Sequence, residues 1–589
     1  MKSFHRLALV VIAVLVLGTL AFLQFNRPTG VRGKSPARPV TGEQTPEALL
    51  AQDLALSDPV VIALTTGRRS EVFGVLETGH QYTEASAACA RADCRQVNIY
   101  NFEENVLIAV IVDVDARRVL DVLEMPGQLP DGNDRLREVA IQAIMNAPEI
   151  EAQLGWVPTR EDIYLNPSSL GGTECGYTHP CLGAVFPTGD RLLWAHVDLT
   201  TETFAGIGWT DVPEADGEFV EFVPDSGCPP FGEVTRHGWD LDYSVTPSDG
   251  LWLGNVTYNG FPIITSAKLA EWHVDYGGPG NGFVDATGCI GGGGQFAIFP
   301  YGDTQVLDLI DLGQNIVGFE VVQDFRMGNW GAQCNYRYEQ HFQFFADGRF
   351  RVVAGAFGQG CGDVSIYRPL IRIDIAAGGD ENDRFAIWDG AGWANQLTEF
   401  WTSQSETITP EGFAWRVKDT VADYGFYIEP GQGQFEDGGH GDDAFVYVVS
   451  HKANEGDVDM SAVGPCCNNN HEQGPHNFIT GESINGQNIV IWYVPQFITN
   501  VGAGPEYCWT VNGEPNPETY PCFGGPMFHP FGFGAITPTP SSTVTATPTQ
   551  TATPGSTQSA TPTQTPTPTV TVTLPPANTW IYLPVIRKE

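Results

Sequence analysis

The chain has 589 residues, and its 30 Lys and Arg residues against 70 Asp and Glu residues give a formal net charge of −40. A negative field of this size repels nucleic acids and anionic membrane surfaces, so we exclude both as partners and expect cationic ligands. Hydrophobic residues make up 42% of the chain and aromatic residues 11%, which excludes wholesale disorder. With 67 Gly and 42 Pro residues as well, an all-helical protein is not expected.

The N-terminus carries the pattern of a targeting segment. An apolar run from Leu7 to Leu23 follows Lys2 and Arg6. This is typical of a secretory signal peptide or an uncleaved N-terminal anchor, which we assign to residues 1–30. We therefore expect an extracellular protein, secreted or attached to the cell surface, and expect its 12 Cys residues to form disulfides.

Two small α+β domains are predicted next, at residues 41–150 and 151–235. Their signals are helical spacing at Leu49–Leu56 and Asp134–Ala147, and strand-like runs at Val106–Val114 and Leu192–Leu199. A faint internal repeat links the two domains. Val112-Asp113 is followed by the apolar residues Val119 and Val122. Val197-Asp198 is followed, at identical offsets, by Phe204 and Ile207. Each copy is interpreted as a strand, a polar turn and a second strand.

From residue 236 to residue 536 helical periodicity disappears. Short alternating strands recur between Gly, Pro, Asn and Asp, at Leu251–Tyr258, Ile316–Gln323, His341–Phe345, Phe350–Ala354, Leu370–Ile375, Ala444–Val449 and Ile489–Val494. This pattern indicates a large antiparallel β-sandwich. The fold class is therefore α+β N-terminal modules followed by a large antiparallel β-sandwich.

The C-terminal part divides into two further segments. Residues 537–576 consist of Thr, Pro, Ser, Gln and Ala, which cannot bury a core and predict an extended linker or stalk. Residues 577–589 form a short apolar tag with a basic end. The tag is interpreted either as a surface-sorting or docking signal, which would associate the protein with the cell surface, or as one small strand that packs back on the body.

Five motifs inside the sandwich region occur in the order found in one known family. They are Gly250–Gly277, Phe283–Ala286, Cys334–Tyr338 with Phe345–Gly348, Ile371–Asp374 and Ser483–Tyr493. Together they resemble the catalytic domain of copper-containing amine oxidases. The resemblance covers roughly residues 239 to 493 and implies that the sandwich is of the copper amine oxidase type.

In that family a tyrosine is oxidised in place to topaquinone, which converts a primary amine to an aldehyde, ammonia and peroxide. The resemblance implies that Tyr336 is the quinone precursor and that Asp285 is the catalytic base. It also implies a copper cofactor, a cationic primary amine as substrate or ligand, and a homodimer formed through the sandwich.

The copper ligands of the family are three imidazoles, two of them in an H-x-H pair. Family spacing places the equivalent positions at Ser365, Tyr367 and Thr499, none of which is His, and no H-x-H pair occurs in the chain. Three hydroxyls are poor ligands for Cu(II), which prefers nitrogen. Two hypotheses remain open: a primary-amine oxidase that recruits histidines from elsewhere, and a non-catalytic surface binding or adhesion protein, a pseudoenzyme, that reuses the sandwich.

Calcium is a further possible cofactor. The resemblance matches Asp374 to the first carboxylate of a peripheral calcium site, although Ala376 and Asn488 stand at two later positions of that site. The acidic stretches Glu436–Asp443 and Glu455–Asp459 could also bind calcium. The alternative is that both are solvated turns.

The cysteines are predicted to pair mainly as local disulfides, Cys89 with Cys94 and Cys175 with Cys181. Two longer pairings are predicted, Cys289 with Cys334 and Cys508 with Cys522. Adjacent Cys466 and Cys467 lie near His451, His471 and His476 in the sequence. This group predicts disulfides with loop histidines, with a zinc or copper site as the alternative.

Overall fold

The computed structural model describes residues 35–532 apart from residues 41–43, 79–88, 90–91, 190, 212–220, 223–227, 278–280, 290–297, 331–333, 359, 380, 422, 432–440, 461, 501–508 and 512–517. The predicted N-terminal targeting segment, the Thr/Pro-rich stalk and the C-terminal tag lie outside the described residues, as does most of the acidic stretch Glu436–Asp443. Among the described residues no single helix has the length and apolar character needed to cross a bilayer. The helices Pro46–Leu56 and Pro59–Thr65 reach that length and apolar character only together, and the chain bends by 71° between them.

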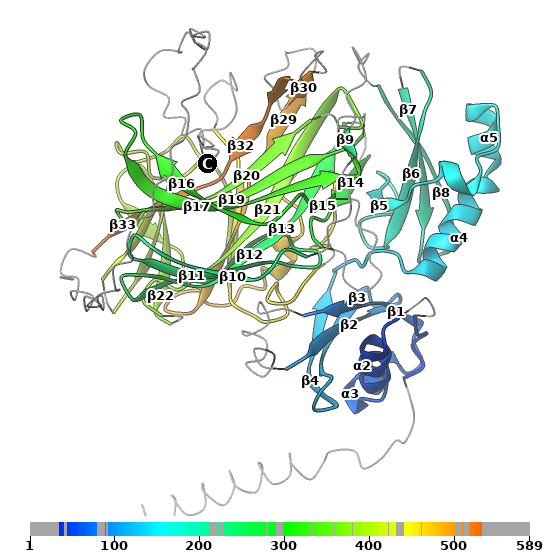
Figure 1. The fold of residues 1–589 in the computed structure, drawn as a ribbon, viewed down its shortest axis with the longest axis horizontal. Coiled ribbons are helices and arrows are strands. Elements are labelled where there is room, and N and C mark those ends of the chain that lie inside the picture. Colours follow the sequence, from blue (N-terminus) through cyan, green and yellow to red (C-terminus); the bar gives the residue numbers. More distant parts are fainter. Residues whose placement is uncertain are drawn as a thin grey trace, which may run out of the picture.

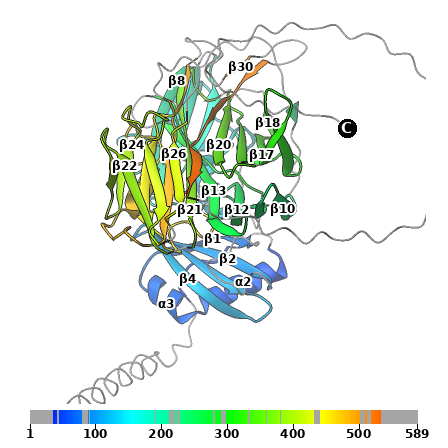
Figure 2. The ribbon, with the colours of Figure 1, turned by 90° about the vertical axis from the view of Figure 1, so that its left-hand side faces the viewer.

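The first module is a four-stranded antiparallel sheet in the order β1-β2-β3-β4, covered on one face by two helices (Figures 1 and 2). Its elements are α2 (Pro46–Leu56), α3 (Pro59–Thr65), β1 (Ser70–Glu77), β2 (Cys94–Asn101), β3 (Val106–Asp113) and β4 (Arg118–Pro126). Both helices begin with a proline after a capping side chain: Thr45 accepts from the backbone N–H of Ala48, and Asp58 accepts from that of Val60.

The second module packs α4 (Asp134–Met145) against a four-stranded antiparallel unit, with α5 (Pro148–Leu154) beyond it (Figure 1). The strands are β5 (Asn166–Ser169), β6 (Cys181–Pro187), β7 (Arg191–Asp198) and β8 (Thr203–Asp211), and a short 3₁₀ turn, η2 (Arg160–Asp162), precedes them. The Asn133 side chain accepts a hydrogen bond from the backbone N–H of Leu136 and so caps α4.

The sandwich consists of two large antiparallel sheets. The first has 14 strands in the order β24-β27-β28-β21-β13-β14-β5-β6-β7-β8, with β10, β11, β12 and β29 attached at the side, so it continues into the second module. Its remaining strands are β10 (Gly232–Arg236), β11 (Trp239–Val245), β12 (Leu251–Tyr258), β13 (Phe261–Asp275), β14 (Gly282–Asp285), β21 (Val364–Ile375), β24 (Phe400–Ser403), β27 (Phe445–Ser450), β28 (Ile489–Val494) and β29 (Phe497–Asn500).

The second sheet has 11 strands in the order β15-β17-β19-β20-β33-β26-β25-β22-β23, with β16 and β32 attached. Its strands are β15 (Ile298–Pro300), β16 (Gln305–Ile310), β17 (Ile316–Met327), β19 (Arg337–Phe345), β20 (Phe350–Phe357), β22 (Asp383–Trp388), β23 (Trp393–Asn395), β25 (Trp415–Asp419), β26 (Gly425–Glu429), β32 (Cys522–Gly524) and β33 (Met527–Phe531). Short elements outside both sheets are β9 (Glu221–Phe222), β18 (Asn329–Trp330), η3 (Pro475–Phe478), β30 (Trp509–Val511) and β31 (Glu518–Tyr520).

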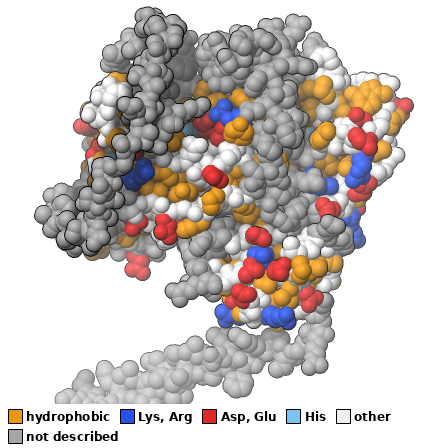
Figure 3. Space-filling model, viewed as in Figure 1, with side chains coloured by type: hydrophobic (Ala, Val, Ile, Leu, Met, Phe, Trp, Pro, Cys, Tyr) orange, Lys and Arg blue, Asp and Glu red, His pale blue; other side chains and the backbone are white. Residues whose placement is uncertain are grey.

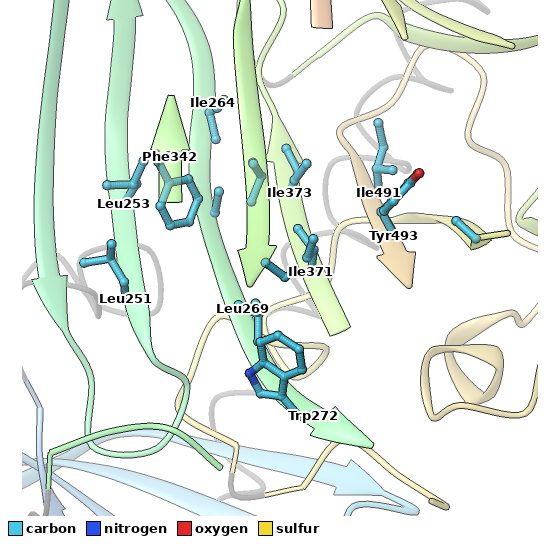
Figure 4. Close-up of a cluster of buried hydrophobic side chains, with 14 of the residues drawn as sticks. Leu251, Leu253, Ile264, Leu269, Trp272, Phe342, Ile371, Ile373, Ile491 and Tyr493 are labelled. Atoms are coloured by element: carbon cyan, nitrogen blue, oxygen red, sulfur yellow. The ribbon is translucent and has the colours of Figure 1, made fainter. Parts of the chain in front are cut away.

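The core of the sandwich lies between these sheets. Leu251, Leu269 and Ile373 of the first sheet and Phe342 of the second belong to one buried cluster, which Figure 4 shows. Strand β13 is 15 residues long and pairs with both β12 and β21, so it is covered on both edges and forms the centre of the first sheet. The predicted fold class, small α+β modules followed by a large antiparallel sandwich, is confirmed.

The disulfides confirm the local predictions and correct one longer one. Cys89 pairs with Cys94 and Cys175 with Cys181, and Cys466 pairs with its neighbour Cys467.

Cys289 does not pair with Cys334 as the sequence suggested. It pairs with Cys228, and Cys334 pairs with Cys361, at Cα–Cα distances of 4.8 and 4.4 Å. The prediction was wrong because the segment after β20 returns beside the start of β19, a long-range contact that strand patterns do not reveal. Cys522 is disulfide-bonded, and Cys508 lies outside the described residues.

Candidate functional site

Four buried tyrosines and one aspartate meet where the two sheets face each other, and we call them the tyrosine cluster. Tyr276 follows β13, Asp285 ends β14, Tyr336 directly precedes β19, Tyr338 lies in β19, and Tyr367 lies in β21. The exposed fraction of each residue is 7% or less. The cluster therefore joins both sheets and includes both residues predicted as catalytic.

Tyr336, the predicted quinone precursor, is enclosed on several sides. Its hydroxyl forms a short hydrogen bond with the hydroxyl of Tyr276, and its oxygen lies 3.1 Å from Sγ of Cys361. Its ring stacks on that of Tyr338 at a centroid distance of 5.9 Å. Burial raises the pKa of Tyr336 well above its ordinary value, so the side chain is a neutral phenol at physiological pH.

Asp285, the predicted base, contacts the same stack through Tyr338. The Tyr338 hydroxyl donates a hydrogen bond of 2.7 Å to Oδ2 of Asp285, and its ring stacks on Trp272 at a centroid distance of 4.0 Å. Burial raises the pKa of Asp285 to about 7, although the hydrogen bond from Tyr338 and the charge of His273 lower it. A carboxyl group with this pKa can exchange protons near neutral pH.

The three positions predicted as copper-ligand equivalents lie together, next to Tyr336. Ser365 of β21 is directly opposite Thr499 of β29, and Tyr367 lies two residues further along β21 on the same face. The ring of Tyr367 meets that of Tyr336 edge-on at a centroid distance of 6.3 Å. Positions from two separate sequence segments are thus neighbours in space, while their equivalence to copper ligands stays a prediction.

These residues do not fit copper. All three side chains end in hydroxyls, and burial raises the pKa of Tyr367, which keeps its phenol protonated. A Cβ atom added to Gly360 would lie 2.4 Å from Oη of Tyr367 and 3.0 Å from Oη of Tyr276, so backbone already closes this side of the site. Cu(II) needs nitrogen donors that this arrangement does not supply.

Two buried histidines of the sandwich, on β13 and β19, bond to other partners. His273 bonds to Glu271 and Gln473 at 2.6 and 3.1 Å, on the face of β13 opposite to that of Trp272. His341 lies 3.0 Å from carboxylate oxygens of both Glu320 and Glu339.

Burial lowers the pKa of His341, but the carboxylates of Glu320 and Glu339 raise it to about 9, so the imidazole is protonated at neutral pH and both its nitrogens are engaged. Within the described part of the chain, no histidine makes a hydrogen bond or ring contact with the tyrosine cluster.

Asp374, the predicted calcium ligand, is fully buried and lies close to two other candidate ligands. Single ligand atoms of Asp374, His451 and Asp457 lie within 4.8 Å of one another, the one such group of three found among the described residues. The Arg372 guanidinium lies 2.7 Å from Asp457 and 3.8 Å from Asp374, and Nε2 of His451 lies 2.9 Å from Asp457.

Side chains of the protein supply the positive charges that face Asp374 and Asp457. Burial lowers the pKa of His451, but its hydrogen bond to Asp457 and the charges of Asp457 and Asp374 raise it to about 9. A protonated imidazole and a guanidinium therefore already balance the two carboxylates. We interpret the group as an ion-pair network of Arg372 and His451 with Asp374 and Asp457.

The Cys466 and Cys467 sulfurs do not meet the nearby histidines. The two cysteines are bonded to each other. The ring of His471 stacks on Trp401 at 3.7 Å, and Nδ1 of His476 accepts from the backbone N–H of Gly474. These contacts fit the prediction of a disulfide with loop histidines.

Sequence reasoning did not single out Tyr276, Gly360 or Cys361. Tyr276 is the tyrosine near the end of the motif Gly250–Gly277 and lies one residue beyond β13. Its place in that motif could therefore have marked it as a candidate site residue. Gly360 and Cys361 belong to a loop that carries no motif, and only their contacts with Tyr367 and Tyr336 reveal them.

No protein-family model and no curated protein matches this chain. Several solved structures are similar to it. A copper-containing benzylamine oxidase from Hansenula polymorpha has a TM-score of 0.47 and 14% identity, covering 82% of this chain and 97% of the oxidase. An amine oxidase from Aspergillus nidulans has a TM-score of 0.44 and 11% identity over 85% of this chain and 91% of its own.

Lysyl oxidase PPLO from Pichia pastoris has a TM-score of 0.42 and 12% identity, over 86% of this chain and 91% of its own. The likeness to all three concerns the fold only.

Proposed function

We propose that this chain is an exported, non-catalytic binding or adhesion protein built on an amine oxidase-like sandwich. The observation that carries the proposal is the arrangement of Ser365, Tyr367 and Thr499. These side chains lie together beside Tyr336, where the family resemblance would place copper, and they offer three hydroxyls. Without nitrogen ligands there is no redox metal next to Tyr336 to drive its oxidation to a quinone.

The packing around Tyr336 supports the same conclusion. Its hydroxyl is engaged by Tyr276 and lies beside the disulfide between Cys334 and Cys361. These contacts hold the phenol as a structural side chain of the core. The five disulfides formed between described cysteines are typical of an oxidising, extracellular compartment, and the charge of −40 favours a cationic ligand.

The second candidate function is a primary-amine oxidase, and Asp285 is the observation that favours it. Its pKa of about 7 suits a general base, and Tyr338 links it to the ring of Tyr336. This candidate requires histidines brought to the site from elsewhere in the chain.

Quinone staining and metal analysis of the purified full chain distinguish the two candidates. We expect a colourless protein without stoichiometric copper, no quinone stain and no peroxide released from benzylamine. The matched control is Tyr336→Phe, which removes only the hydroxyl that a quinone would need.

Wild-type and Y336F proteins should then behave alike in every assay. A stain or peroxide signal that disappears in Y336F would instead establish the oxidase. Light scattering on the same samples tests the expected homodimer, whose formation does not depend on the quinone.

A further inference from the structure

A buried lysine and a buried aspartate that do not belong to the tyrosine cluster face each other. Lys268 lies in β13, and Asp249 lies in the turn before β12; their side chains are 4% and 0% exposed. The Lys268 ammonium makes a short hydrogen bond to Oδ2 of Asp249 and donates a second bond of 3.0 Å to the carbonyl of Val458. Neither group takes part in the proposed function.

The backbone on both sides of this pair is fixed. Lys268 is held between two strands, opposite Trp252 of β12 and Arg372 of β21. Asp249 donates its backbone N–H to the Thr246 hydroxyl at 2.7 Å, and its Oδ1 accepts from the backbone N–H of Met460 at 2.8 Å. The carboxyl group is therefore oriented with its second oxygen toward the amine.

A second buried carboxyl group belongs to the same site. Asp459 is 2% exposed, and its Oδ2 accepts a hydrogen bond of 2.9 Å from the backbone N–H of Ser248, next to Asp249. Burial raises the pKa of Asp249, and the charge of Asp459 adds to this effect while Lys268 opposes it. The three groups thus act on one another in a space with little water.

We propose that Lys268 and Asp249 condense in the folded protein to a side-chain amide that ties β13 to the turn before β12. Nζ of Lys268 attacks Cγ of Asp249, a C–N bond forms, and one C–O bond breaks. Two of the three ammonium protons leave with that oxygen as water, and the third stays on the amide nitrogen. No oxidation occurs, one positive and one negative charge disappear together, and the negative charge of Asp459 favours transfer of a proton to Asp249 across its hydrogen bond with Lys268.

Two physical effects favour this reaction at the site. Holding the amine against the carboxyl group gives a high effective concentration, as in intramolecular reactions. Burying an ion pair costs solvation free energy, which a neutral amide does not lose to the same degree. Lys452 and Glu455 provide the contrast within the chain, because their pair, at 3.2 Å, has a lysine side chain that is 27% exposed. Water stabilises that ion pair, so we expect it to remain ionic.

Tryptic digestion of the reduced, denatured full chain tests the proposal directly. Trypsin cleaves after a free lysine and not after one whose amine is acylated. We expect the segment 237–326 as one peptide, lighter than its sequence mass by one water molecule, while cleavage after Lys452 is complete in the same digest. Fragmentation should locate the missing water between positions 249 and 268. A peptide 237–268 of full mass as the main product would overturn the proposal.

Variants separate the roles of the three residues. Lys268→Arg keeps the positive charge but has no amine to acylate, so its digest should contain peptide 237–268 at full mass. Asp459→Asn keeps the shape of the side chain and removes the acid, so we expect uncondensed Lys268 in a protein that still folds. If either variant fails to fold, the wild-type digest decides alone. Neither result depends on whether the chain is a binding protein or an oxidase.

Discussion

Two aspartates of this protein show how burial changes the pKa of a side chain. Asp285 and Asp311 are both aspartates, yet burial raises the pKa of the first, while hydrogen bonds from Asn315 lower that of the exposed second. The motif around Asp285 marked this residue as a candidate catalytic base. Its raised pKa follows from burial between the two sheets, against which the hydrogen bond from Tyr338 acts, and the motif does not encode that burial.

The free energy of unfolding should depend on the protonation of Asp285. Its pKa is raised from 3.8 to about 7 in the folded protein. The folded state therefore keeps a proton that the unfolded state loses. This contribution to stability is fully present below pH 3.8 and is lost as the pH rises through about 7, a fall of about 4 kcal/mol over the window. Asp285→Asn should remove this fall.

Urea denaturation between pH 4 and pH 8 measures the effect. The matched control is Asp303→Asn, an exposed aspartate on the surface, which should keep the wild-type slope. Equal slopes in D285N and wild type would show that Asp285 ionises freely in the folded protein.

At the scale of elements, the two small modules repeat one hairpin. In both β3–β4 and β7–β8 the register shifts at the same place, between Ile111 and Val112 and between His196 and Val197. In both, an aspartate caps the turn: Asp113 accepts from the N–H of Ala116, and Asp198 from that of Thr200. The repeat predicted from sequence offsets is therefore confirmed, because these offsets fix local turn geometry.

Disulfides of different span should differ in their contribution to stability. Cys228 and Cys289 are separated by 61 residues, and Cys89 and Cys94 by 5. Because a longer loop loses more entropy on closure, Cys228→Ser with Cys289→Ser should lower the free energy of unfolding by about 4 kcal/mol, and the Cys89/Cys94 double serine variant by about 2 kcal/mol. Chemical denaturation of both variants checks this order. A larger loss from the short loop would contradict the chain-entropy explanation.

At the scale of the whole molecule, ion pairs as well as sheet pairing connect the parts. Figure 3 shows acidic, basic and hydrophobic side chains interspersed over the first module. Arg135 of α4 bonds to Glu71 of β1 at 2.6 Å and to Glu202 of the β7–β8 turn at 2.9 Å. Glu71 is 3% exposed, so this arginine balances a buried charge between the first module and the second.

Replacing Arg135 should loosen that contact. Arg135→Gln leaves the buried Glu71 with weaker compensation, and we expect a loss of about 3 kcal/mol in the free energy of unfolding. Arg160→Gln is the matched control, because Arg160 pairs with Glu138 on the surface at 59% and 44% exposure and should cost no more than about 0.5 kcal/mol. Thermal denaturation of both variants tests this. Equal losses would show that the Arg135 pairs contribute no more than a surface pair.

The sequence by itself determined the class of the fold, the strands and the local disulfides, because alternation, turn residues and short cysteine spacings act over a few residues. Spacing taken from the family resemblance pointed to Ser365, Tyr367 and Thr499, which lie together in the structure, while their equivalence to copper ligands stays a prediction. Only the tertiary structure decided the partners of Cys289 and Cys334, the closure of the tyrosine cluster by Gly360, and the meeting of Lys268 with Asp249 and Asp459. These contacts depend on which loops return to which sheet, and the free energy that selects them comes from burial in the assembled sandwich.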